Sequence, residues 1–342
     1  MPESDQVRIS LEEVHRLTEG ALRVNGASPE NAHAVARTIT LAERDDCKAH
    51  GLFRVPFYVK GLTDGKVNGT AVPEIQDISS GLAMVDAHRG YAPLAIRAGI
   101  EELVGKARVS GIAAVSIVNC YHVAALWPEV EWLAERGFVS FAFTQYLAFV
   151  APAGGTQRVY GTNPMAFGWP RHGAPPLVFD QASSASSRGD LLLHNRDGKR
   201  IPLGWAIDDD GNPTTDPAEG LKGAQLPFGG YKGAALALMV ELLAGALIGA
   251  PFSFEATESD PREDMPPLGG ELIMAIDPTH FPADPQDPLS HAEKLFGRVL
   301  SQPGTRLPSD RRYAARKESV SDGVLVPGAF YQSLQEMAAG VV

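Results

Sequence analysis

A strand, a helix and a second strand are predicted over residues 112–145, and their order constrains the fold more than any other feature. The β-branched run IAAVSIVNC (112–120) is typical of a buried strand. The segment YHVAALWPEVEWLAERG (121–137) predicts a helix with Pro128 in its early turns and Gly137 at its end. FVSFAFTQ (138–145) predicts the second strand. This unit indicates an α/β protein.

The signatures of the commonest nucleotide and hydrolase sites are absent from the sequence. No G-x-G-x-x-G follows a strand, and there is no Walker loop, H-E-x-x-H or G-x-S-x-G. A bound nucleotide would therefore not be held in the standard Rossmann manner. The 9 histidines have no metal-ligand spacing, so we expect no metal site.

Charge and cysteine usage narrow the possible partners. A net charge of −11 argues against nucleic-acid and anionic membrane surfaces, although a basic pocket for a small anion stays possible. The 2 cysteines, Cys47 and Cys120, form no disulfide framework and fit a reducing compartment. The start of the sequence, MPESDQVRIS, lacks the pattern of a secretory signal, so we expect a cytoplasmic protein.

One apolar stretch is long enough to raise the question of a membrane. GAALALMVELLAGALIGA (233–250) carries Glu241 near its centre, where an acidic side chain costs roughly 3 kcal/mol on insertion scales. We expect a buried helix and no membrane partner.

The 342 residues suggest two domains. Residues 1–75 and 285–342 are predicted to form a helical domain that contributes a histidine loop. Its first two helices are indicated by the Ser10 and Glu13 capping box and by Pro29 at a helix start. Residues 76–284 are predicted to form an α/β domain that binds nucleotide and substrate, with loops and short strands over 145–232.

Three cations in seven residues mark the first candidate site. Lys48, His50 and Arg54 lie in DDCKAHGLFRVPFYVKGL (45–62), just after a predicted helix. They are candidates for binding an anionic substrate, and the planar fork of Arg54 suits a carboxylate best. His50 can donate a proton near neutral pH, but it can equally be an ordinary loop histidine.

Three further segments each allow a functional and a structural interpretation. NCYHVAAL (119–126) leaves a strand and enters a helix, so its backbone N–H groups could hold phosphate, or His122 could simply pack there. SRGD (187–190) combines a cation, a glycine and a carboxylate, as an ordinary surface turn also does. The three arginines of RLPSDRR (306–312) suit a 2′-phosphate or a solvated basic turn.

Seven ordered blocks resemble the malate/L-lactate dehydrogenase-like oxidoreductases, and within them the Δ1-piperideine-2-carboxylate/Δ1-pyrroline-2-carboxylate reductases. The blocks are HGLFRVPFY, YHVAALWPEVEWLAERG, YGTNPMAFG, VFD, RGD, LPFGGYKG and RLPSDRRY. The resemblance implies a homodimeric, NADPH-dependent reductase of small anionic cyclic imino acids, with NADH as a possible substitute. It also implies a non-Rossmann α/β fold with a central mixed or antiparallel sheet and a helical N- and C-terminal part.

The same resemblance assigns roles to individual residues. His50 matches the proton donor, Asp190 its acidic partner, and Arg54 and Thr162 the ligands of the substrate carboxylate. The positions that match cofactor-binding residues are His122, Val123, Ala124, Ala125, Leu126, Asp180, Gln181, Ala182, Arg188, Gly189, Tyr231, Arg306, Leu307, Pro308, Ser309, Asp310, Arg311 and Arg312.

Ala49 departs from the pattern, because a serine usually precedes the histidine and belongs to its relay. Loss of one orienting hydrogen bond is worth about 1 kcal/mol, or roughly tenfold in rate, so we expect weakened or retuned activity. Two alternatives stay open: an NAD(P)-dependent dehydrogenase of 2-hydroxy acids of the malate, lactate or ureidoglycolate type, and an inactive homologue that binds nucleotide. Open-chain N-alkyl imines of 2-oxo acids are further candidate substrates.

Overall fold

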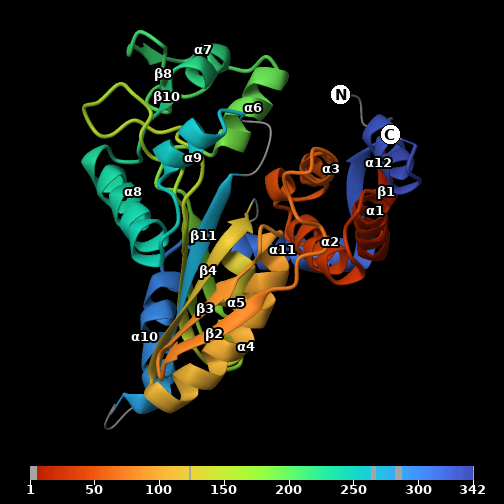
Figure 1. Ribbon diagram of the computed structural model, residues 1–342. Coiled ribbons are helices and arrows are strands. Elements are labelled where there is room, and N and C mark those ends of the chain that lie inside the picture. Colours follow the sequence, from red (N-terminus) through yellow and green to blue (C-terminus); the bar gives the residue numbers. More distant parts are fainter. Residues whose placement is uncertain (1–5, 123–124, 263–266, 282–286, 342) are drawn as a thin grey trace.

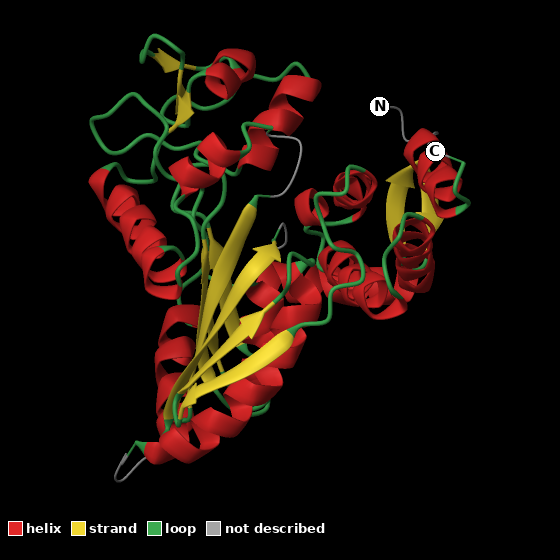
Figure 2. Ribbon diagram, in the orientation of Figure 1, coloured by secondary structure: helices red, strands yellow, loops and turns green. Residues whose placement is uncertain are grey.

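A twisted sheet of seven strands forms the centre of the molecule, with a separate helical part beside it (Figures 1 and 2). The computed structural model describes residues 6–122, 125–262, 267–281 and 287–341. In spatial order the strands are β2 (Glu74–Ser79), β3 (Leu82–Asp86), β4 (Ile112–Tyr121), β11 (Leu268–Ile276), β5 (Val139–Thr144), β6 (Met165–Trp169) and β7 (Leu177–Gln181). Only the β3–β4 pair is parallel, so the predicted α/β class with a mixed or antiparallel sheet is confirmed, and the sheet is mixed and mostly antiparallel.

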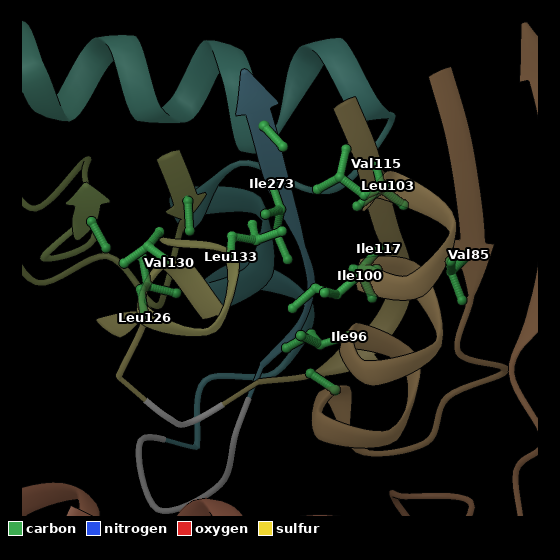
Figure 3. Packing of buried hydrophobic residues seen from close by; sticks show 14 of the residues in the cluster. Val85, Ile96, Ile100, Leu103, Val115, Ile117, Leu126, Val130, Leu133 and Ile273 are labelled. Atoms are coloured by element: carbon green, nitrogen blue, oxygen red, sulfur yellow. The ribbon is translucent and has the colours of Figure 1, made fainter. Parts of the chain in front are cut away.

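Two helices cover one face of this sheet and build the largest core. They are α4 (Ala92–Ser110) and α5 (Trp127–Glu135). Ile100 and Leu103 of α4 pack on Val115 and Ile117, which alternate along β4 and point to that face (Figure 3). The predicted strand, helix and strand are confirmed as β4, α5 and β5, but the helix begins at Trp127 and not at residue 121, and β11 lies between the two strands.

Helix α8 (Tyr231–Ala244) covers the opposite face, where Val240 and Ala244 pack on residues of β5 and β11. The expectation of a buried helix is wrong for its outer side. Only 33% of Tyr231–Ile248 is buried, and Leu238 and Leu242 are exposed. By length and hydropathy this stretch could cross a membrane. Its Glu241, however, is buried and accepts a 2.8 Å hydrogen bond from the Asn163 side chain, which ties the helix to the neighbouring loop.

The helical part is built from both ends of the chain. It contains α1 (Leu11–Val24), α2 (Pro29–Arg44), α3 (Val55–Thr63), α11 (Asp310–Asp322), α12 (Gly328–Ala338) and the strand pair β1 (Gln6–Ile9) and β12 (Val324–Pro327). The Ser10 hydroxyl caps α1, but the Glu13 carboxylate bonds Arg16 and does not complete the predicted capping box. Pro29 stands at the start of α2, as predicted, and the Ser28 hydroxyl caps that helix. In contrast, α10 (Pro288–Leu300) lies beside the sheet, where Glu293 pairs with Arg171 at 2.7 Å (Figure 1). The domain boundaries themselves stay a prediction.

The parts of residues 145–262 outside β6, β7 and α8 form a smaller layer above the sheet in Figure 1. It holds α6 (Arg188–Arg196), α7 (Pro217–Lys222), α9 (Ser253–Ser259) and a small sheet of β8 (Ala206–Ile207), β9 (Pro213–Thr214) and β10 (Ala224–Gln225). Loops and short strands were expected here, and α6 and α7 are additional. Both are short helices capped by a side chain, Ser187 and Asp216 respectively.

Candidate active site

A cavity of about 280 Å³ lies where the loop after α2 meets the start of α6 and the ends of the central strands. It brings together many of the residues that the sequence singles out, from segments far apart in the chain. The predicted residues that line it are Ala49, His50, Arg54, His122, Ala125, Thr162, Asp180, Gln181, Ala182, Arg188, Gly189 and Arg312.

The loop that carries His50 is folded around a buried carboxylate, Glu43. Its Oε1 accepts the Leu52 N–H at 2.8 Å, and its Oε2 lies 3.1 Å from Lys48 Nζ. A Cβ atom on Gly51 would lie 2.1 Å from Glu43 Oε1, so no other residue fits at Gly51 without a shift. Lys48 therefore balances Glu43 and is not among the residues that line the cavity, so its predicted contact with substrate gains no support from the geometry.

Arg54 is fixed in orientation by its own loop. Its Nε donates a 2.7 Å hydrogen bond to the Ala49 carbonyl, and its guanidinium lies 5.7 Å from the Phe57 ring centroid. Because this bond uses the Nε–H, the two terminal amino groups of the fork remain to donate to a carboxylate in the cavity.

The start of α6 packs against the same loop. Ser187 caps the helix by accepting the Asp190 N–H at 2.9 Å, and the Asp190 carboxylate accepts the Ser187 N–H at 3.3 Å. A Cβ atom on Gly189 would lie 3.4 Å from the Ala49 side chain. Asp190 follows the cavity-lining Gly189 in the chain, and it does not itself line the cavity.

Asp180, at the end of β7, occupies the helix start that was expected to hold phosphate. Its carboxylate accepts the N–H groups of Leu126 at 2.8 Å and Trp127 at 3.1 Å. Burial raises the pKa of Asp180, while these N–H groups and Arg312 oppose the increase. These two N–H groups are therefore already paired, and phosphate binding by the segment 119–126 stays a prediction. Val123 and Ala124 lie outside the described residues.

A buried acidic pair lies behind His122. The His122 Nε2 is 3.2 Å from Oε2 of Glu271, a fully buried residue of β11. Burial, followed by the charge of Glu271, holds the pKa of buried Glu129 well above its usual value. His122 thus lines the cavity on one side and contacts the buried carboxyl group of Glu271 on the other.

A second hollow of about 440 Å³ adjoins the cavity and shares Cys47 and Arg312 with it. Its other lining residues are Asp45, Asp46, Arg306, Pro308, Ser309, Arg311 and Ala315. The Arg312 guanidinium lies 4.6 Å from the Trp127 ring centroid, and its Nη1 is buried without a hydrogen-bond partner in the described part of the chain. The predicted arginine segment is thus brought to the edge of the cavity.

Some of the predicted cofactor residues have structural contacts instead. Leu307 is buried, and its N–H donates to the Asp310 carboxylate at 2.8 Å. The Ser309 hydroxyl donates to the Val178 carbonyl. Tyr231, 72% exposed at the start of α8, lines neither hollow, so the structure does not bring it to the site.

The cavity is also lined by residues to which the sequence assigned no individual role, including Ser187 of the SRGD segment. They are Cys47, Trp127, Thr144, Tyr146, Pro164 and Ser187. Burial raises the pKa of Cys47 to about 11, so its thiol stays protonated. No local pattern marks these residues, because they come from five separate segments.

A buried ion network holds the end of α2 in place before the His50 loop. Asp45 accepts hydrogen bonds from Arg316 at 2.7 and 2.9 Å, from Arg44 Nε at 2.7 Å and from Trp127 Nε1 at 3.1 Å. Arg316 also donates to Glu131 of α5 at 2.8 Å. Burial acts to raise the pKa of Asp45, but the two arginines outweigh it and the pKa is lowered.

The chain belongs to the malate/L-lactate dehydrogenase family, whose model matches residues 9–335. It is therefore an oxidoreductase of a family that uses a nicotinamide cofactor. The Δ1-pyrroline-2-carboxylate/Δ1-piperideine-2-carboxylate reductase of Pseudomonas aeruginosa is 49% identical over 329 residues, 96% of this chain and 98% of that protein. The Δ1-pyrroline-2-carboxylate reductase of Ancylobacter novellus is 46% identical over 97% of this chain and 98% of that protein.

The fold agrees with a solved structure of the same group. The crystal structure of Δ1-piperideine-2-carboxylate reductase from Pseudomonas syringae pv. tomato superposes with a TM-score of 0.92. It is 40% identical in sequence, and the match covers 97% of this chain and 99% of that one. The resemblance stated from the seven blocks is thereby confirmed.

Proposed function

We propose that the protein reduces cyclic imines that carry a carboxylate beside the C=N carbon, with NADPH as reductant. Δ1-pyrroline-2-carboxylate would give L-proline and Δ1-piperideine-2-carboxylate would give L-pipecolate. One observation carries the proposal: an acid, His50, and a pre-oriented guanidinium, Arg54, face one cavity of about 280 Å³. The names of the relatives that are 46–49% identical agree with this chemistry.

Each residue has a separate task in this reaction. Arg54, held by the Ala49 carbonyl, and Thr162 would bind the substrate carboxylate and so fix which face of C2 is presented. His50 would deliver the proton to the ring nitrogen, and Asp190, at the start of α6, would favour the charged imidazole. Because Ala49 has no hydroxyl, one orienting contact is lost. The acid and the ligands of the substrate carboxylate are kept.

The residues present fit a dinucleotide with an extra phosphate, bound without a Rossmann motif. When bound, NADPH supplies the hydride that C2 accepts. The buried Nη1 of Arg312 and the neighbouring Arg306 and Arg311 provide a basic hollow next to the catalytic one, as a 2′-phosphate requires. His122, Gln181 and Arg188 line the cavity itself and would contact the remainder of the cofactor.

Steady-state kinetics tests the proposal. The purified protein is mixed with NADPH or NADH and either cyclic imine, and the loss of reduced cofactor is followed by absorbance. We expect turnover of at least one imine and a lower KM for NADPH than for NADH. No turnover of either imine, together with rapid oxidation of a 2-hydroxy acid, would instead support the dehydrogenase. Tight NADPH binding with no turnover of any of these substrates would support an inactive homologue.

We also propose that the protein is a cytoplasmic homodimer in which a second copy covers the outer side of α8. Leu238 and Leu242 of α8 and Leu247, just after the helix, are exposed, and apolar surface of this kind favours association. We expect light scattering after size-exclusion chromatography to give twice the chain mass of 36.5 kDa. The variant Leu242→Glu should give the mass of the monomer. A monomeric wild-type protein that floats with lipid vesicles would contradict the dimer.

A further inference from the structure

Two histidines and a glutamate, residue types that can bind metals, converge on the helical part and are not among the residues that line the cavity. His15 and Glu19 lie one turn apart on α1, and His33 comes from the neighbouring helix α2. Both imidazole Nδ1 atoms face one carboxylate oxygen, Glu19 Oε2, at 3.4 Å from His15 and 3.6 Å from His33. The three atoms lie within 4.8 Å of one another.

These separations suit coordination better than hydrogen bonding. A hydrogen bond between such groups spans about 2.7–3.2 Å, so both contacts are too long for a good one. Zinc binds histidine nitrogen and carboxylate oxygen at about 2.0–2.2 Å, and the edge of a tetrahedron with those bonds is roughly 3.3–3.5 Å. The two nitrogen-to-oxygen distances fall close to that edge.

We propose that His15, Glu19 and His33 form a binding site for a divalent transition-metal ion such as Zn²⁺, with water completing the coordination. Two imidazoles and one carboxylate are a donor set that zinc commonly has in proteins. No sequence motif reveals the site, because His33 is supplied by a second helix. The expectation of no metal site, which rested on histidine spacing, did not take that helix pairing into account.

The packing around these three side chains holds them close together without a bound ion. The helices α1 and α2 share one core through Leu17, Leu22 and Val35, so the ligands sit on a rigid pair. The two imidazole rings already meet edge to face, with centroids 4.9 Å apart.

Other charged groups lie near the three proposed ligands and influence the affinity of the site for a cation. Arg23 Nη1 lies 4.0 Å from the second oxygen of Glu19, which leaves Oε2 to the imidazoles. Glu30, Arg97 and Glu101 line the hollow beside His33. A cation bound at Oε2 would replace the two long contacts with short bonds and join α1 to α2.

Titration of the full-length protein, first stripped with a chelator, tests the site. Co²⁺ is the spectroscopic probe, since tetrahedral coordination by nitrogen and oxygen gives a visible absorption band, and Zn²⁺ is used for competition. We expect one equivalent of Co²⁺ to bind with a visible band that Zn²⁺ removes. His33→Gln and His15→Gln should each weaken binding roughly ten- to hundredfold.

The matched control is His291→Gln, which removes an exposed histidine outside the cluster and should bind Co²⁺ like the wild type. All variants are compared by circular dichroism, and Zn²⁺ should raise the melting temperature of the wild type and the control but not of His33→Gln. Absence of a Co²⁺ band and of any Zn²⁺-dependent melting shift in the wild type would overturn the proposal. Equal binding by wild type and both cluster variants would place the metal elsewhere and overturn it as well.

Discussion

Replacement of Arg316 by methionine tests how the catalytic loop is held. Methionine keeps much of the length of the side chain but removes the charge that pairs Asp45 and Glu131. The Asp45 side chain is 0% exposed and that of Glu131 is 7% exposed, so both carboxylates lose a partner that water cannot replace. Breaking a buried ion pair from one side typically costs about 3–5 kcal/mol.

The contacts that Asp45 keeps in Arg316→Met place the expected loss of stability at the lower end of that range. Arg44 still pairs with Asp45 at 2.7 Å, and the Trp127 indole still donates to it, so we expect a loss of about 3 kcal/mol in the free energy of unfolding. Equilibrium unfolding in urea at neutral pH measures it. Because the folded pKa of Asp45 is lowered, its contribution is present above its unfolded pKa of about 3.9 and is lost as the pH falls through the folded value.

Two companion variants make the result decisive. Arg298→Met alters an exposed arginine of α10 and should change stability by no more than about 0.5 kcal/mol. Adding Glu131→Gln to Arg316→Met removes the carboxylate that is left with only the more distant Arg44, 3.7 Å away, and should recover part of the loss. Wild-type stability in Arg316→Met, or no recovery in the double variant, would refute this account of the network.

Three further changes have defined outcomes. Gly51→Ala should lower both stability and activity, because its Cβ would lie 2.1 Å from Glu43 Oε1; wild-type values would mean that the loop relaxes freely. Glu129→Gln should leave stability unchanged below about pH 4.5 and increase it above, since the raised folded pKa makes ionisation of Glu129 unfavourable to folding; urea midpoints across pH show whether the gain is present. Ala49→Ser should raise kcat up to roughly tenfold, and an unchanged kcat would argue against a relay through that position.

Local chemistry made much of the fold predictable. The Ser10 side chain caps α1, Pro29 stands in the first turn of α2, and the β-branched run 112–120 forms a largely buried strand, so short windows suffice. The place of β11 between β4 and β5 could not be predicted in this way. That strand comes from residues 268–276, and its pairing is decided by tertiary contact.

Site residues could be predicted only where the type of the residue itself indicates a chemical role. His50 and Arg54 stand out because cations in an apolar run need an anion or a partner. Lys48 looked similar, but its partner is Glu43, five residues earlier on α2. Glu271 could not be singled out, because a glutamate within an apolar strand gains meaning only when β11 places it 3.2 Å from His122.

The rate of imine reduction by His50→Asn tests the central claim most directly. Asparagine keeps a polar side chain in the cavity but cannot donate a proton as an imidazolium does. We predict that kcat with Δ1-pyrroline-2-carboxylate falls by about 10²–10⁴-fold, while NADPH binding, followed by fluorescence, stays within a fewfold of the wild type. An unchanged kcat in this variant would contradict the assignment of His50 as the acid.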